Sequence, residues 1–188
     1  MARPAGRRGR RKERNVAGDN DADRIKAGDL IREIKRAGIR FVVALPDRTT
    51  SEHMLKTMIK DPDFQVVQVC KEDEGVSICS GLYAAGHRSL LLMQYTGLLD
   101  SINAVRGVAV QGKNPVCMMV GMLQKEPGVP PTQSKRYGLR IIEPILDAMQ
   151  IEHHNIEAPG EWDKVVPAVE RAYTDLMPVA MLIGREPI

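Results

Sequence analysis

The sequence offers little that would place this chain in a membrane or a secretory pathway. No apolar run approaches the roughly 18 residues of a membrane-spanning helix, and the first residues lack the apolar core of a secretory signal. Only three cysteines are present, Cys70, Cys79 and Cys117, without CxxC or metal-ligand spacing and all in or beside apolar runs. We therefore expect reduced, mostly buried thiols in a cytoplasmic protein.

Standard nucleotide-binding and catalytic motifs are also absent. The sequence contains no GxGxxG, GxxxxGK[ST] or GxSxG motif, and no Ser or Cys has an obvious His partner. Neither a dinucleotide site nor a P-loop is therefore indicated. The four histidines (His53, His87, His153 and His154) lack metal-ligand spacing and stand in polar settings. We expect them in surface or loop positions and predict no metal ligands in this chain.

Positive charge is concentrated at the N-terminus. Residues 1–16 carry seven arginines or lysines and one acid, Glu13, a balance of +6, so the overall net charge of +3 leaves about −3 for the rest. We expect residues 1–20 to be a disordered basic tail and residues 21–188 to form one domain, because 43% hydrophobic content suffices for a core. The acidic body argues against nucleic-acid binding, although the tail alone has the charge to contact a polyanion such as RNA.

Short apolar runs alternate with helical patterns throughout the predicted domain. This alternation predicts an α/β fold, a doubly wound, largely parallel six-stranded sheet with helices on both faces. The Pro- and Gly-rich stretch 122–137 is long for a loop, so it is a candidate functional loop. The expected strands are 41–45, 64–69, 89–93, 115–120, 151–155 and 178–183, and the expected helices are 23–37, 50–59, 73–85, 100–110, 139–149 and 161–175.

The stretch 70–103 is the predicted functional centre. Its acidic triplet Glu72-Asp73-Glu74 follows a buried strand and precedes a helix thinned by small residues. Acids in a first turn often only complement the helix dipole, but a carboxyl beside apolar neighbours can also exchange a proton near neutral pH. The turns 46–50, 70–75 and 94–100 each leave the carboxyl end of a strand, so all three should share the edge where such sheets bind ligands.

Several motifs of this chain resemble a known family in their order and spacing. They include Lys71–Tyr83, Leu92–Leu98 and the closing Pro-Val-Ala-Met-Leu-Ile-Gly-Arg185. Together they resemble the pyrimidine-binding domain of thiamine-diphosphate-dependent 2-oxo acid decarboxylases. The resemblance runs from about residue 24 to the end and is strongest to the alpha subunit of sulfopyruvate decarboxylase and to the related phosphonopyruvate decarboxylases.

The resemblance implies roles for particular residues. A family glutamate at the start of this helix, nine residues before a glycine matching Gly81, hydrogen-bonds N1′ of the cofactor's aminopyrimidine, and it corresponds to Glu72. Thr96, Gly97 and Leu98 match the turn along the pyrimidine ring, where a small residue permits close backbone approach. The resemblance also implies substrate-side residues, namely Pro46, Asp47, Arg48, Asn103 and Gln133. For these positions a plain turn or an ordinary surface residue stays the alternative.

The chain departs from the family at informative places. Leu99-Asp100 stands where Gly-Asn is usual, and Arg48 stands where the family has Ser. Arg48 has the chemistry to pair with a carboxylate, sulfonate or phosphonate. The diphosphate–Mg²⁺ segment, a Gly-Asp-Gly followed by Asn-Asn, appears nowhere in the sequence. The resemblance therefore implies half an active site, completed by a beta subunit that binds the diphosphate of thiamine diphosphate through Mg²⁺.

These observations predict the alpha subunit of a decarboxylase that is inactive without its beta partner, in a homo- or hetero-oligomer. Its substrate would be a small anionic 2-oxo acid such as 3-sulfopyruvate or phosphonopyruvate, and the cofactor would carry the hard chemistry. One alternative is a non-catalytic binding or assembly module that keeps the fold without the cofactor. Another is an RNA-associated protein that acts through its basic tail.

Overall fold

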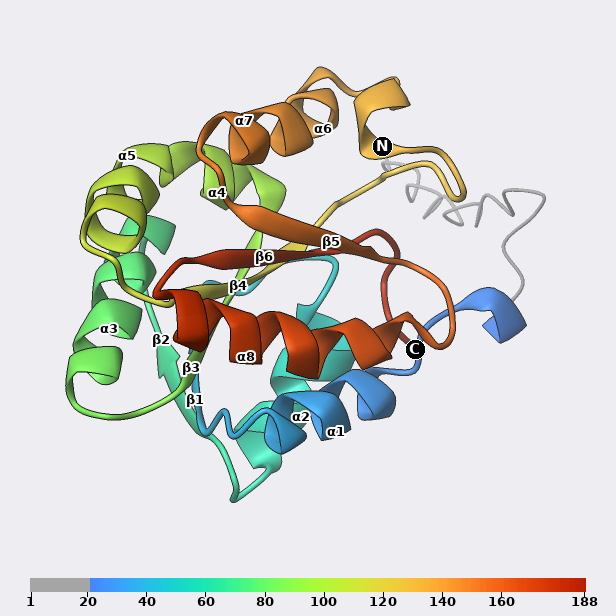
Figure 1. Ribbon diagram of the computed structural model, residues 1–188. Helices are drawn as coiled ribbons and strands as arrows, with labels where there is room; N and C mark the ends of the chain where they lie inside the picture. Colours follow the sequence, from blue (N-terminus) through green and yellow to red (C-terminus); the bar gives the residue numbers. More distant parts are fainter. Residues whose placement is uncertain (1–20) are drawn as a thin grey trace, which may run out of the picture.

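Six parallel strands form a single sheet in the computed structural model, which describes residues 21–188. The strand order is β2-β1-β3-β4-β6-β5, and every neighbouring pair is parallel. The predicted doubly wound α/β fold is thereby confirmed (Figure 1). The strands are β1 (Phe41–Ala44), β2 (Gln65–Gln68), β3 (Ser89–Gln94), β4 (Cys117–Gly121), β5 (Glu152–Ile156) and β6 (Val179–Ile183).

Alternation of side chains along the central strands divides the core between the two faces of the sheet. In β3, Leu90 and Leu92 join one hydrophobic cluster, whereas Leu91 and Met93 join the other. Both faces are therefore apolar, as a sheet with helices on each side requires. Strand β2 differs, because it stands at the edge and none of its residues is fully buried.

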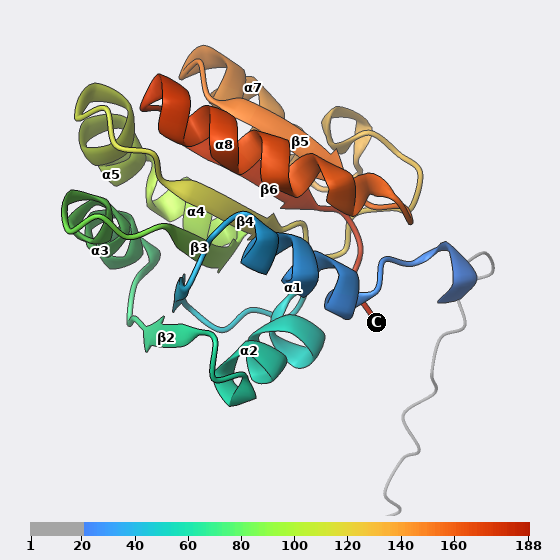
Figure 2. The same ribbon diagram turned by 60° about the horizontal axis from the view of Figure 1, so that its bottom comes forward.

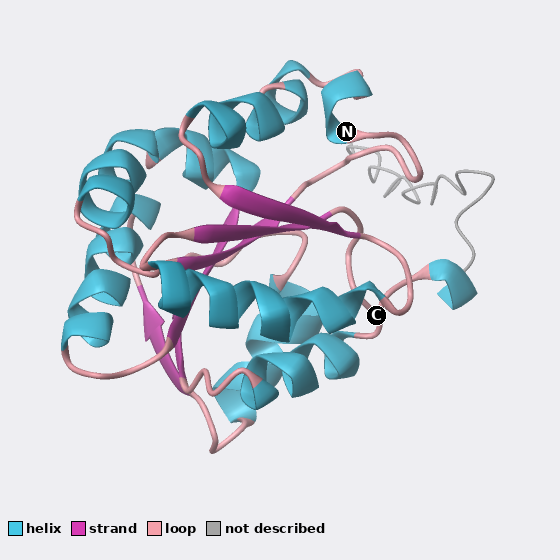
Figure 3. Ribbon diagram, viewed as in Figure 1, coloured by secondary structure: helices cyan, strands magenta, loops and turns pink. Residues whose placement is uncertain are grey.

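The helices form two layers, with the strands between them (Figures 2 and 3). One layer contains α1 (Ala27–Arg36), α2 (Lys56–Lys60) and α8 (Val165–Asp175), which cover the cluster with Leu90 and Leu92. The opposite layer contains α3 (Glu72–Ala84), α4 (Tyr95–Asp100), α5 (Ile102–Ala104), α6 (Tyr137–Arg140) and α7 (Ile142–Ala148). Five further helical segments are η1 (Asp21–Asp23), η2 (Ser51–Leu55), η3 (Val105–Gln111), η4 (Pro131–Gln133) and η5 (Glu161–Lys164).

The structure corrects the prediction for the segment after β3. A turn over 94–100 and a helix over 100–110 were expected, but helix α4 follows the strand at once and α5 and η3 continue beyond Ser101. Ser101 is the C-cap residue of α4, and it stabilises the last turn: its backbone N–H donates to the carbonyls of Gly97 and Leu98, and its hydroxyl donates to Gly97 O at 2.7 Å. Burial of Leu98 favours the helix over the turn that Thr-Gly chemistry suggests.

Other predictions are refined. Cys79 and Cys117 are buried, Cys70 is exposed, and all three are free thiols. His153 and His154 lie half-buried on strand β5 rather than in a loop, whereas His53 and His87 are exposed. The predicted basic tail, residues 1–20, lies outside the described residues. Within residues 21–188, no helix has the length and apolarity that a membrane crossing demands.

The thiols provide a test of this packing. Burial raises the pKa of Cys79 to about 11 and raises the pKa of Cys117 as well, so both should stay protonated and unreactive up to about pH 9. Titration of the native protein with a thiol-reactive disulfide should modify Cys70 alone, and denaturant should expose the other two thiols. Cys70→Ser should abolish the fast reaction, and equal reactivity of all three native thiols would contradict the fold.

Candidate functional site

Asp47, Glu72 and Gly97 lie in the segments that follow the carboxyl ends of β1, β2 and β3. From β1 the chain crosses to β2 on one side, then returns past β1 to β3 on the other side. Helix α2 covers one face of the sheet after β1, whereas α3 covers the opposite face after β2. The direction of the chain thus reverses between β1 and β3, and open α/β sheets bind ligands at the carboxyl ends of strands at such a point.

The structure separates the three acids of the triplet. The Glu74 carboxylate accepts the backbone N–H groups of Cys70 and Lys71 at 3.1 and 3.3 Å, so it satisfies donors ahead of α3. Asp73 lies 3.5 Å from the Lys71 ammonium. Glu72 makes no hydrogen bond or ion pair within residues 21–188. Of the three, only Glu72 keeps its carboxyl available for a ligand.

Two glycines bring Glu72 close to the sheet and to α4. A Cβ on Gly75 would lie 2.5 Å from Cδ1 of Leu91, so the missing side chain lets α3 sit tightly on β3. A Cβ on Gly97 would collide with the carboxyl group of Glu72 itself. Glu72 and Gly97, predicted separately as cofactor contacts, are therefore in direct contact. Leu98 beside them is buried, and Thr96 is exposed.

Two residues that depart from the family pattern, Leu99 and Asp100, lie beside this contact. Asp100, at the end of α4, lies 3.3 Å from the Lys71 ammonium at the start of α3. This contact raises the pKa of Lys71, mainly through the hydrogen bond to Asp100. Leu99 is half-buried and packs against the core beneath α3 and α4. Leu99 and Asp100 thus join the two helices that carry Glu72 and Gly97.

Asp47 organises the turn after β1. Its carboxylate accepts the N–H groups of Thr49 and Thr50 at 2.5 and 2.6 Å and the Thr50 hydroxyl at 2.6 Å, while its own N–H donates to Ser51 Oγ. Thr50 is the N-cap residue of η2 by position, but neither the Thr50 nor the Ser51 hydroxyl caps that helix, because both bond to Asp47. These bonds favour the turn-forming reading of Asp47 over direct substrate contact. Pro46 is exposed.

Arg48 stands apart from these bonds. Its side chain is exposed and has no polar partner within the described part of the chain. It lines a cavity of about 240 Å³ together with Thr49 and Lys125. Sequence reasoning missed these two residues. Thr49 offered only the weak signal of a hydroxyl in a Pro-Asp turn, and the burial of Lys125 depends on a partner 32 residues away.

The two predicted amides are not joined to Glu72. Asn103 is exposed, and its carboxamide oxygen accepts two N–H groups of Arg106 at 3.3 and 2.9 Å. Gln133 is exposed at the end of η4 within the Pro-rich loop. No hydrogen bond in residues 21–188 connects either amide to the carboxyl group of Glu72, so both keep only their sequence-based assignment.

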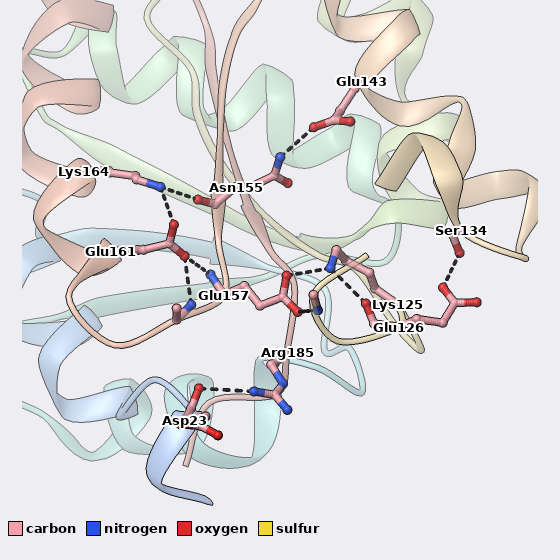
Figure 4. A network of polar contacts seen from close by, with 12 residues as sticks. Asp23, Lys125, Glu126, Ser134, Glu143, Asn155, Glu157, Glu161, Lys164 and Arg185 are labelled. Carbon is pink, nitrogen blue, oxygen red and sulfur yellow. Dashed lines mark hydrogen bonds and ion pairs between the residues drawn. The ribbon is translucent and has the colours of Figure 1, made fainter. Parts of the chain in front are cut away.

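Polar contacts fix the Pro-rich loop to the rest of the domain (Figure 4). Lys125 pairs with Glu157 at 2.6 Å, and Glu157 also accepts the N–H of Gly128. Glu126 accepts the Ser134 hydroxyl at 2.7 Å, which is the main cause of the lowered pKa of Glu126. Within residues 21–188, no three His, Cys, Asp or Glu side chains are grouped closely enough to hold a metal ion.

Comparison with known proteins identifies similar chains. No family model matches the sequence. The chain is 28% identical over 160 residues to sulfopyruvate decarboxylase subunit alpha of Methanococcus maripaludis, covering 82% of this chain and 91% of that protein. The corresponding subunit of Methanocaldococcus jannaschii is 27% identical over 154 residues, covering 81% and 89%. The sulfopyruvate decarboxylase of Methanosarcina acetivorans is 34% identical over 88 residues, 46% of this chain and 22% of that protein. The predicted resemblance to sulfopyruvate decarboxylase alpha subunits is confirmed.

The contact between Glu72 and Gly97 can be tested without cofactor. Gly97→Ala should lower the free energy of unfolding by about 1–3 kcal/mol, because its Cβ would displace the Glu72 side chain. Removing the obstacle with Glu72→Ala should reduce that loss by at least about 0.5 kcal/mol in a double-mutant cycle measured by urea unfolding.

Gly81 provides the matched control. It lies in the same helix as Glu72, and a Cβ there would meet nothing within 4 Å. Gly81→Ala should stabilise the protein by about 0.5–1 kcal/mol through helix propensity alone. Equal effects of the two alanine substitutions, or strict additivity of Gly97→Ala with Glu72→Ala, would refute the contact.

Proposed function

We propose that this chain, which is similar over four fifths of its length to alpha subunits of sulfopyruvate decarboxylase, is the alpha subunit of a thiamine-diphosphate-dependent decarboxylase. Its substrate would be a small anionic 2-oxo acid of the 3-sulfopyruvate type, and a beta subunit would complete the active site. The similarity supports the subunit type. The arrangement of Glu72 and Gly97 supports the cofactor.

One observation carries the proposal: Glu72 has no polar partner within residues 21–188 and packs against the bare backbone of Gly97. A half-buried carboxyl left unpaired at a helix start is available to a ligand nitrogen. The missing Cβ at Gly97 lets the Glu72 carboxyl lie directly against the backbone of α4, and the buried Leu98 beside it is apolar. These residues therefore fit the aminopyrimidine half of thiamine diphosphate.

In this role Glu72 would hold a proton in a hydrogen bond to a ring nitrogen of the aminopyrimidine. When bound, thiamine diphosphate supplies a thiazolium that accepts the electron pair released as CO₂ leaves. Glu74 and Lys71 would only support the start of α3, since their polar groups are already bonded. The tight packing of α3 on β3 would keep Glu72 in register with Gly97.

The diphosphate end of the cofactor has no counterpart in this sequence. A diphosphate requires a cation and its oxygen ligands, and the Gly-Asp-Gly pattern is absent. We therefore assign Mg²⁺ and the diphosphate to the beta subunit, with the active site between the two chains. The edge of the sheet that carries Glu72 and Gly97 would face that partner.

Roles on the substrate side rest on position. Arg48 is an exposed cation in the turn after β1 and has no polar partner in the described chain, so it is assigned to the anionic end of the substrate. Asp47 and Pro46 would act by shaping the turn that presents Arg48. Asn103 and Gln133 are proposed contacts from the sequence resemblance alone.

Reconstitution provides the functional test. The chain alone should be inactive, and the complex with its beta subunit, thiamine diphosphate and Mg²⁺ should release CO₂ from 3-sulfopyruvate. Glu72→Gln should lower kcat by at least about 100-fold, because it removes an essential proton-transfer group. The control is the neighbouring Asp73→Asn, which removes the exposed ion pair with Lys71, keeps an oxygen to accept the N–H of Glu74, and should keep most of the activity.

Cofactor binding separates the proposal from its alternative. Calorimetric titration of the alpha–beta complex with thiamine diphosphate and Mg²⁺ should show one saturable site for each alpha–beta pair. A properly assembled complex that binds no cofactor would instead identify the chain as a binding or assembly module without catalytic chemistry. Retention of most activity by Glu72→Gln would also overturn the assignment.

A further inference from the structure

A basic cavity lies at the carboxyl ends of the strands, the edge of the sheet that also carries Glu72 and Gly97. It has a volume of about 240 Å³ and is lined by the segments that follow β1, β4 and β6. Four of its lining side chains are basic and one, Glu186, is acidic. The basic residues are Arg24, Arg48, Lys125 and Arg185.

Two of these arginines are held in place by the ends of the domain. The Arg24 guanidinium donates to the carbonyl oxygen of Glu186 at 3.1 and 2.7 Å, and Arg185 donates to Asp23 O at 3.2 Å. Figure 4 shows the Arg185 contact beside the Lys125–Glu157 pair. The segment around Glu186 therefore fixes Arg24, and the segment around Asp23 fixes Arg185. These two arginines of the cavity are thus preorganised.

The charges are not all equivalent. The Lys125 ammonium is buried and already paired with Glu157 at 2.6 Å, so its charge is largely compensated. Asp47 lies close by, but its carboxylate is occupied by the N–H groups of Thr49 and Thr50. Arg48 lacks any polar partner in residues 21–188. Its guanidinium is the cation with most to gain from an anion.

A buried hydroxyl provides an independent observation. Thr49 lines the cavity, is only 4% exposed, and its Oγ1 has no hydrogen-bond partner within residues 21–188. An unsatisfied buried hydroxyl is costly, and a ligand acceptor reached by rotation of this side chain would satisfy it. Gln124, also in the lining, has φ of 62°, a conformation that is uncommon outside glycine and concentrated at functional sites.

We propose that this cavity binds a small oxyanion of a strong acid, such as a sulfonate, sulfate or phosphate. Arg48 supplies the uncompensated charge, Thr49 supplies a hydroxyl, and the clasped Arg24 and Arg185 supply a fixed positive field. The site belongs to this chain alone and needs neither cofactor nor partner. Its occupant comes from one of two sources, the anionic end of the substrate or a free inorganic anion.

The site can be tested on the full-length chain. Titration with sulfate or methanesulfonate at constant ionic strength, followed by NMR and calorimetry, should show saturable binding, whereas acetate should bind much more weakly. Arg48→Gln should weaken binding of both anions by about tenfold or more, as loss of a charge-assisted contact does. Thr49→Val, which removes only the hydroxyl, should weaken binding severalfold without loss of folded structure by circular dichroism.

Arg171→Gln is the matched control, since Arg171 is an exposed arginine on α8 that pairs with Glu152 and does not line this cavity. It changes net charge by the same amount and should leave anion binding unchanged. If Arg48→Gln and Arg171→Gln weaken anion binding equally, the binding depends on the net charge of the protein and not on this cavity, and the proposal is overturned. Absence of saturable binding by the wild-type chain would overturn it as well.

The reconstituted complex distinguishes the source of the anion and separates this proposal from the decarboxylase assignment. If sulfate competes with 3-sulfopyruvate and Arg48→Gln raises KM more than it lowers kcat, the substrate's sulfonate occupies the site. If sulfate binds without competing, a free inorganic anion occupies it. If the chain binds the anion but the complex is inactive, the anion site stands and the decarboxylase assignment is refuted. If the complex is active but its alpha chain binds no anion, the decarboxylase assignment stands and the anion site is refuted.

Discussion

The proposed function depends on one contact, in which the Glu72 carboxyl group packs against the backbone of Gly97. It requires a glycine at residue 97, because any Cβ there would occupy the position of the carboxyl group. It also requires α3 to lie close to the sheet, which Gly75 permits against Leu91. A further tie is the Lys71–Asp100 pair, which joins the start of α3 to the end of α4. The site is thus built from two helix starts that parallel strands bring together.

The fold was largely predictable from sequence, since short apolar runs alternating with helical patterns indicate a parallel sheet whatever the function of the protein. The exception is the segment after β3. Thr96-Gly97 has the local chemistry of a turn, but burial of Leu98 and the bonds from Ser101 to Gly97 extend a helix through it. The packing of Leu98 in the core, which depends on residues distant in the sequence, therefore outweighed the local preference for a turn.

The candidate site was predictable only in part. The motif match identified Glu72 and Gly97, but it could not reveal that Glu74 and Asp73 are occupied by Cys70 and Lys71. Of the basic cavity, sequence reasoning predicted only Arg48 as a partner for an anion. Arg24 and Arg185 come from opposite ends of the domain, and their hydrogen bonds depend on a tertiary arrangement that leaves no local signature in the sequence.

The central claim is that Glu72 activates the cofactor, which can be measured without any substrate. Deuterium exchange at C2 of thiamine diphosphate, followed by NMR in the alpha–beta complex, reports that activation directly. The exchange should be much faster in the wild-type complex than in free cofactor, and Glu72→Gln should return it nearly to the free rate. Equally fast exchange in the Glu72→Gln complex would contradict the role assigned to Glu72.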